Sequence, residues 1–191
     1  MPVSTRSGPA LLAGRLARDL DAAFPDLVVA HQDGIYSGVR RLVSTAADAE
    51  DVTQETFVRA YRALLDYSPE RIEALGLPGW LWTIALNLCR NAARGRLRKP
   101  AAAPLSLAGD QADAADTAAD ALATVAEDEW RERLDALSRP VRTAVVLRHV
   151  VGLPYVDIAA AVDRPPGTVK ADVHRGLARL RDMLDNEAGG K

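Results

Sequence analysis

The stretch that most constrains this chain is PAAAPLSLAGDQADAADTAADALATVAED, residues 100–128. It is rich in alanine and aspartate, contains two prolines, and has no lysine or arginine and no large apolar residues at a sustained period. This composition is typical of a linker or a marginal helix, because it offers too little apolar surface to bury in a core. The 191-residue chain is therefore expected to form two small domains on either side of residues 101–127.

Charge is distributed unevenly around this linker. Residues 101–127 carry five acidic side chains and no basic one, whereas residues 1–100 have a net charge of +2 and residues 128–191 of +1. The formal net charge of the whole chain is −2. An acidic strip thus separates two mildly basic halves, and the total charge is a poor guide to what either half binds.

Several classes of protein are excluded or disfavoured by composition. The single cysteine, Cys89, excludes an internal disulfide and a cysteine-based zinc site, and its apolar neighbours on one helical face predict a buried structural thiol rather than a redox switch. The three histidines are not at metal-ligand spacing. No signal peptide is recognisable, and no stretch approaches the roughly 18 apolar residues of a membrane span. We expect a cytoplasmic protein with no membrane insertion, catalytic set, cofactor or metal.

Both flanking parts are predicted to be all-α. Apolar residues recur at helical steps of three and four, no segment alternates as a strand would, and no βαβ pattern occurs. The fold is therefore two small helical domains joined by the acidic linker. The predicted boundaries are residues 1–26 for an N-terminal extension with one helix, 27–100 for the first domain, 101–127 for the linker, 128–187 for the second domain and 188–191 for the tail.

Prolines and capping residues indicate where individual helices begin and end. Pro25 is expected to stop or kink the first helix, Ser44 or Thr45 to cap the third, and Pro78 to open the fourth. Near the C-terminus, Asp163 is expected to form a tight turn in the left-handed conformation that aspartate tolerates. Two helices joined by such a turn have the layout of a helix-turn-helix.

The last helix, GTVKADVHRGLARL onwards from Gly167, is the candidate reading helix. The side chains expected to face inward are Val169, Val173, Leu177, Leu180 and Leu184. The side chains expected outside, on the part that would enter the major groove or just after it, are Thr168, Lys170, Ala171, Asp172, His174, Arg175 and Arg179. A plain helical hairpin with a solvated face is the alternative, but the tight turn and the clustered bases favour DNA binding.

A second basic helix precedes the linker in LPGWLWTIALNLCRNAARGRLRK. Its last ten residues hold five basic and no acidic side chains, and Asn87, Asn91 and Arg94 share one face. Arginines hold phosphates and asparagines bond base edges, so this face favours nucleic acid. Trp80 and Trp82 could stack on an exposed base, although a core position is favoured for each tryptophan taken alone.

A third segment, DAEDVTQETFVRAYRAL, carries an acidic ridge. Asp51, Glu55 and Arg59 recur every four residues, with Gln54 beside them. Carboxylates near the start of a helix repel phosphate, so this surface is expected to face solvent or a basic protein partner. No nearby His, Ser or Cys turns these carboxylates into a recognisable catalytic set.

Together, AEDVTQETFVRAYRAL, GWLWTIALNLCRNAARGRLR, LSRPVRTAVVLRHVVGLPYVDIAAAV and GTVKADVHRGLARLRDML resemble the extracytoplasmic-function sigma factors of bacterial RNA polymerase, in the sigma-70 superfamily. The resemblance covers roughly residues 27–99 and 130–185. It implies a non-catalytic subunit whose first domain docks on the β′ clamp helices and opens the −10 promoter element. The second domain would sit on the β flap and read the −35 element, and an anti-sigma factor is a further candidate partner.

The resemblance also implies roles for individual residues. The polymerase core would be contacted by Asp51, Gln54, Glu55 and Arg59. The −10 element would be contacted by Trp80, Trp82, Asn87, Arg90, Asn91, Arg94 and Arg96. The −35 element would be contacted by Thr168, Lys170, Ala171, Asp172, His174, Arg175 and Arg179.

The chain departs from the family pattern at several reading positions. Leu86 stands where the family usually has arginine, and Asn91 where it has aspartate. Ala171 and Asp172 replace a serine and an arginine. An acid in the major groove can accept a hydrogen bond from cytosine N4, so these changes are expected to alter the promoter sequence and not the class of function.

A stand-alone helix-turn-helix regulator is the other open interpretation. Its C-terminal part would look much the same, but it would need a sensor or receiver domain, and the N-terminal half shows no signal for either. An all-helical enzyme is the third class, and no residue spacing supports it.

A sigma factor and a stand-alone regulator are expected to differ in how the isolated protein binds DNA. Because the linker contributes −5 beside domains of +2 and +1, we expect the free chain to bind promoter DNA weakly at physiological salt. A gel shift with and without core RNA polymerase measures this directly. Tight, sequence-specific binding without the core would instead identify a self-sufficient regulator.

Overall fold

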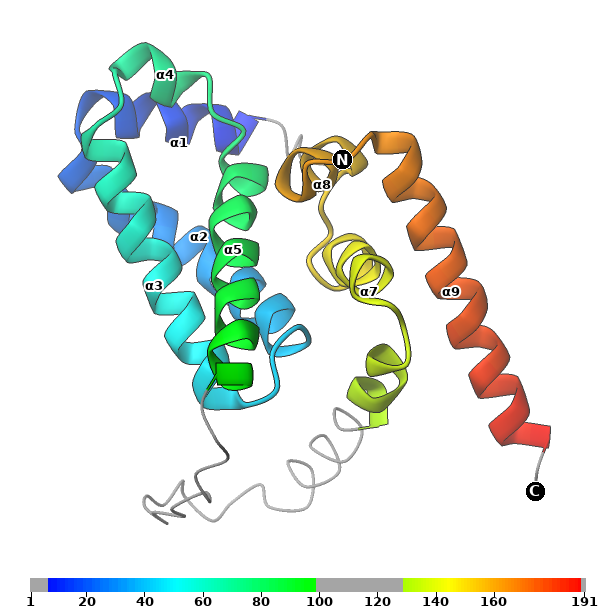
Figure 1. Cartoon of the computed structure of the whole chain (residues 1–191). Helices are drawn as coiled ribbons and strands as arrows, with labels where there is room; N and C mark the ends of the chain where they lie inside the picture. Colours follow the sequence, from blue (N-terminus) through cyan, green and yellow to red (C-terminus); the bar gives the residue numbers. More distant parts are fainter. Residues whose placement is uncertain (1–6, 99–128, 190–191) are drawn as a thin grey trace, which may run out of the picture.

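A computed structural model describes residues 7–98 and 129–189, all of whose regular elements are helices (Figure 1). The elements are α1 (Ser7–Arg18), α2 (Leu20–Arg40), α3 (Ala46–Leu65), α4 (Pro69–Glu73), α5 (Leu77–Arg98), α7 (Arg139–Val145), the π-helical turn η1 (Val146–Val150), α8 (Tyr155–Val162) and α9 (Pro166–Gly189), with residues 129–135 also helical. The all-α fold with two helical domains is confirmed. The predicted linker, residues 101–127, lies outside the described residues, as do residues 190–191 of the tail.

The N-terminal helices differ from the sequence prediction at their first break. The chain turns at Asp19, whose carboxylate accepts the Ala22 amide at 3.1 Å and caps α2, while Pro25 lies inside α2. The N-terminal extension therefore contains all of α1 and the first turns of α2, not one helix ending at Pro25. The loss of one backbone hydrogen bond at Pro25 is tolerated because α2 packs against both α1 and α3.

Other predicted boundaries are confirmed. Thr45 caps α3, accepting the Asp48 amide at 3.0 Å. The fourth predicted helix is α5, which begins at Leu77 beside Pro78. A short helix that was not predicted, α4, precedes α5. Ser68 caps α4, and Pro69 is its first residue. Helices of five residues carry too little periodicity to be recognised in a sequence.

The C-terminal helices form the predicted helix-turn-helix. Ile158 and Ala159 of α8 and Val169 and Val173 of α9 are buried between the two helices and their neighbours. Asp163 ends α8 with φ 53° and ψ 55°, the left-handed conformation expected of it. The side of α9 toward its C-terminal end packs instead on α7 and on helical residues 129–135, around Leu134, Val146 and Leu180.

The two groups of helices pack directly on each other. Helix α5 contacts α3 and α2 on one side and α8 on the other, so that Trp82 and Leu147 belong to one continuous buried cluster. The fit is close at two glycines. A Cβ on Gly38 would meet the Trp82 ring and Val151, and a Cβ on Gly79 would come within 3.2 Å of Asp157. Within the described residues, no helix is long and apolar enough to cross a membrane.

A matched pair of glycines tests this packing. A Cβ on Gly176 of α9 would collide with Val145 and Val141 of α7, whereas one on Gly34 of α2 would meet no atom within 4 Å. We expect Gly176→Ala to lower the free energy of unfolding by about 1–3 kcal/mol through overpacking. Gly34→Ala should raise it by about 0.5–1 kcal/mol, because alanine has the higher helix propensity. Urea denaturation of both variants measures this; stabilisation by Gly176→Ala would contradict the α7–α9 contact.

Candidate nucleic-acid interface

The acidic ridge lies on the outer face of α3. Asp51 and Gln54 are exposed, and the half-buried Glu55 accepts a hydrogen bond from Arg59 Nε at 2.7 Å. The opposite face of the helix is buried through Val52 and other core side chains. An exposed pair such as Glu55–Arg59 contributes about 0–1 kcal/mol to stability. The ridge is therefore available to a basic partner at little cost to the fold.

In the polar strip of α5, two side chains are joined by a hydrogen bond that was not predicted from the sequence. Asn87, Arg90 and Asn91 are exposed, while Leu88 and Cys89 between them are buried. Arg90 donates from Nη2 to Asn87 Oδ1 at 2.7 Å and from Nε to the Leu86 carbonyl at 3.3 Å. These bonds hold the guanidinium and the amide as one unit that presents donors to a phosphate or a base edge. Arg94 and Arg96 lie on the last turns of α5, and their side chains are outside the described residues.

The two tryptophans of α5 occupy different environments. Trp82 is 2% exposed and fills the core beside Gly38, so the prediction that its ring stacks on an exposed base is wrong for this fold. Its burial follows from its position one turn before Ala85 and Leu86 on the face that packs inward. Trp80 is half-buried, with its ring centroid 6.2 Å from that of Tyr67.

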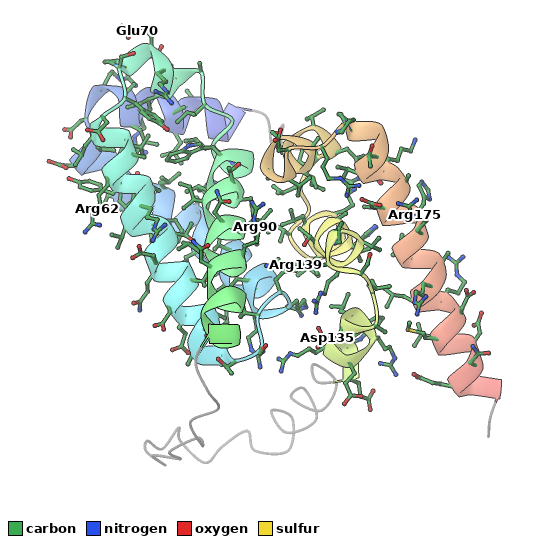
Figure 2. All side chains as sticks on the ribbon, in the orientation of Figure 1. Arg62, Glu70, Arg90, Asp135, Arg139 and Arg175 are labelled. Carbon is green, nitrogen blue, oxygen red and sulfur yellow. The ribbon has the colours of Figure 1, made fainter. Side chains whose placement is uncertain are left out.

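Helix α9 presents most of its predicted reading residues to solvent. The exposed ones are Lys170, Ala171, His174, Arg175 and Arg179, with Thr168 half-buried at the start. Figure 2 shows Arg175 on α9 at the outer side of the molecule. Of the predicted inward stripe, Val169, Val173 and Leu180 are buried and Leu177 is half-buried, but Leu184 is 39% exposed.

Asp172 is the main correction to the predicted site. It is 1% exposed and faces α7 and the turn, not the groove side of α9. Its two carboxylate oxygens accept from Arg164 of the turn and Arg175 of α9. The prediction that it reads a base is therefore wrong; instead it ties the turn to the start of α9. Of its two charge partners, Arg164 and Arg175, only Arg175 could be recognised in the sequence, because it lies three residues after Asp172 on the same helix.

Cys89 is buried, as predicted from its apolar neighbours. Burial raises the pKa of its thiol to about 11, and the positive charges of Arg139 and Arg90 only partly oppose this. A thiol that stays protonated at neutral pH is a poor nucleophile. Within the described residues, no three His, Cys, Asp or Glu side chains come together as metal ligands would.

Two family descriptions match the chain. Sigma-70 region 2 matches residues 27–99, which include α3 and α5, and Sigma-70 region 4 matches residues 127–180, which include the helix-turn-helix. The two matches fall on the two groups of helices that carry the acidic ridge, the polar strip of α5 and the exposed face of α9.

Two similar curated proteins are both named as sigma factors of RNA polymerase. The chain is 36% identical over 170 residues to the ECF RNA polymerase sigma factor SigE of Mycolicibacterium smegmatis, covering 85% of this chain and 63% of that protein. It is 31% identical over 181 residues to the RNA polymerase sigma-H factor of Pseudomonas aeruginosa, covering 91% of this chain and 92% of that one.

Solved structures agree on the fold. CnrH in complex with the cytosolic domain of CnrY has a TM-score of 0.69 at 27% identity, covering 93% of this chain and 97% of that one. The sigma factor RpoE from Bartonella quintana, solved with the anti-sigma factor NepR, has a TM-score of 0.62 at 24% identity, covering 85% and 96%, and shows the fold alone.

The structural role of Asp172 is open to measurement. We expect Asp172→Ala to lower the free energy of unfolding by about 1.5–3 kcal/mol, because it removes two charge-assisted hydrogen bonds at a buried carboxylate. Asp182→Ala, at an exposed position of the same helix, is the control and should change it by less than about 0.5 kcal/mol. Equal stability of the two variants in urea denaturation would show that the Asp172 pairs are dispensable.

Proposed function

The chain belongs to the extracytoplasmic-function sigma factors of the sigma-70 family, and we propose how its helices divide the work of an alternative sigma factor that directs transcription initiation. In this scheme α3 binds core RNA polymerase, α5 engages the −10 element and helps to open it, and α9 reads the −35 element. The match of both sigma-70 regions, in order and on separate helical groups, is the observation that carries the proposal. The chain then acts as a non-catalytic subunit in the cytoplasm.

Charge and exposure support α3 as the polymerase contact. Asp51, Gln54 and Glu55 form the most acidic exposed surface at the N-terminal half of α3, which would repel DNA and attract a basic helix pair such as the β′ clamp. Arg59 bonds Glu55 and fixes its rotamer, so it orients the carboxylate for a partner.

The polar strip of α5 suits the −10 element for a different reason. Asn87 can bond a base edge only if its amide is held in place, and the hydrogen bond from Arg90 holds it. Arg90 is exposed and keeps further N–H donors that could hold a phosphate. With Trp82 buried, a base flipped from the duplex would have only Trp80 of this pair as a stacking partner.

The exposed start of α9 suits major-groove reading. Lys170, His174 and Arg175 face solvent. Asp172, on the buried side of α9, accepts from Arg164 and Arg175 and so ties the start of the helix to the preceding turn. Arg175 bonds Asp172 and is still 67% exposed in its side chain, so it retains donors for a base or a phosphate. Arg179, one turn further, is placed for a phosphate at the groove edge.

The packed arrangement of the two helical groups implies that the protein opens in use. Elements centred near −10 and −35 are roughly 25 base pairs apart, or about 85 Å at about 3.4 Å per base pair. Helices α5 and α8 are in direct contact here, so the reading faces cannot reach both elements at once. Domain separation on the polymerase is therefore part of the proposed function. An anti-sigma factor is proposed as a further partner, supported by the similar CnrH having been solved as a complex with another protein.

The polymerase contact is tested by removing charge from the ridge. We expect the double variant Asp51→Ala, Glu55→Ala to bind core RNA polymerase about tenfold or more weakly, since each lost charge-assisted contact removes about 1.5–3 kcal/mol. Run-off transcription from a promoter library should fall in parallel. The control is Glu70→Ala, Glu73→Ala, which removes two exposed acids from α4. Unchanged core binding by the α3 variant would place the polymerase contact elsewhere.

A further inference from the structure

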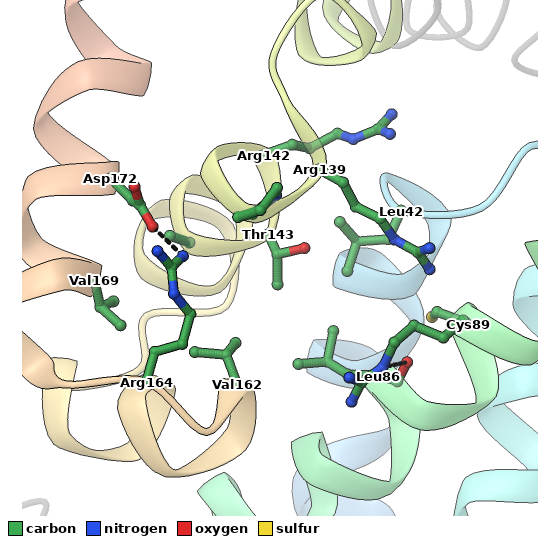
Figure 3. Close-up of a pocket in the computed structure, with 13 residues that line it drawn as sticks. Leu42, Leu86, Cys89, Arg139, Arg142, Thr143, Val162, Arg164, Val169 and Asp172 are labelled. Carbon is green, nitrogen blue, oxygen red and sulfur yellow. Dashed lines mark hydrogen bonds and ion pairs between the residues drawn. The ribbon is translucent and has the colours of Figure 1, made fainter.

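A pocket of ≈180 Å³ lies where the two helical groups meet (Figure 3). Its apolar lining comes from both groups and includes Leu42, Leu86 and Val162, and the Thr143 hydroxyl points into it. An engineered apolar cavity of about 150 Å³ accommodates benzene, so this pocket has room for a ring-sized body.

Four arginines stand around this lining: Arg90, Arg139, Arg142 and Arg164. Two of them are neutralised locally, because Arg142 pairs with Asp135 and Arg164 with Asp172. Arg142 still has a buried Nε with no hydrogen-bond partner. The only acid in the lining, Asp172, is already held by two guanidiniums, so it does little to repel a further anion.

Arg90 and Arg139 are the two cations of this pocket without a counterion. Neither forms an ion pair with any of the described residues. They come from α5 and α7, on the sides of these helices that face each other (Figure 2). Both arginines and the buried Cys89 line this one pocket. Two unmatched like charges across an interface favour separation unless an anion lies between them.

We propose that this pocket binds the phosphate group of a small organic molecule and that the bound molecule holds the two helical groups together. The guanidiniums of Arg90 and Arg139 supply paired N–H donors that match phosphate oxygens, and Thr143 adds a hydroxyl. The apolar body of the ligand lies on Leu86 and Val162. A bound phosphate would also occupy Arg90 and keep it from the −10 element. This consequence rests on the proposed function, whereas the binding itself does not.

Binding is measured by calorimetry on the full chain without polymerase, with phenyl phosphate and inorganic phosphate as probes. Phenyl phosphate should bind more tightly than inorganic phosphate, because only it uses the apolar lining. Arg139→Gln should weaken phenyl phosphate binding at least about tenfold, the effect of one lost charge-assisted contact. Arg139 is exposed, so this change should leave the fold intact. Arg62→Gln, the same charge change at an exposed position of α3, should bind as the unmodified chain does.

A second readout follows the distance between the groups. Fluorophores at Glu50→Cys and Arg181→Cys report it by energy transfer, and the buried Cys89 with its raised thiol pKa reacts slowly with the labels. Phenyl phosphate should raise the population of the packed form in the labelled chain and leave it unchanged after Arg139→Gln.

Three outcomes would overturn the proposal. They are no binding of either probe, equal affinity for the two probes, and equal weakening by Arg139→Gln and Arg62→Gln. Since no polymerase or DNA is present, these outcomes leave the proposed promoter function unaffected.

Discussion

The packing of α5 between two sets of neighbours governs how the remaining surfaces can be used. One side of the helix is committed to α2 and α3 and another to α8, and Trp82 is buried where these contacts meet. Replacing such a tryptophan by alanine typically costs about 3–5 kcal/mol, so this arrangement is not easily altered. Only a narrow strip of α5 remains for polar contact, and Asn87, Arg90 and Asn91 fall on it. The polar strip is therefore limited to the part of the α5 surface that does not pack in the core.

The same reasoning explains the acid in α9. A helix that packs on both α7 and α8 has a buried face wider than one line of apolar residues, and Asp172 falls on its edge beside Val169 and Val173. A buried carboxylate is tolerated only when it is paired and hydrogen-bonded, which Arg164 and Arg175 provide. An acid that appears unfavourable for DNA binding thus leaves the exposed side chains at the start of α9 without an acid, with Lys170, His174 and Arg175 outward.

The sequence predicted the features that depend on local chemistry and missed those that depend on packing between distant segments. The cap at Thr45 and the left-handed Asp163 follow from side chains acting on their own backbone, and both are confirmed. Helical spacing alone leaves open how wide a buried face is: Trp82 is buried because α2 packs closely on that side of α5 at Gly38, and Asp172 because α9 packs on α7 as well as on α8. The break at Asp19 was missed because a good N-cap and a helix-internal proline six residues later give competing signals, and packing decided between them.

Geometry and charge act together on the affinity of the free chain for DNA. Low net charge limits the electrostatic attraction of each domain. If α5 and α9 read the two promoter elements as proposed, the packed arrangement adds a second limit, because it would lose the gain in avidity from two linked sites. Core polymerase can remove both limits if it binds the separated form better than the packed one, because a ligand shifts such an equilibrium only by its difference in affinity. Under the proposed function, Arg90 is the residue at which these states compete: it lines the interface pocket with Arg139 in the packed form, and we propose that it holds a phosphate of the −10 element in the separated form. Repulsion between the two cations would raise the free energy of the packed form and favour separation, and an anion that neutralises the pair would favour the packed form.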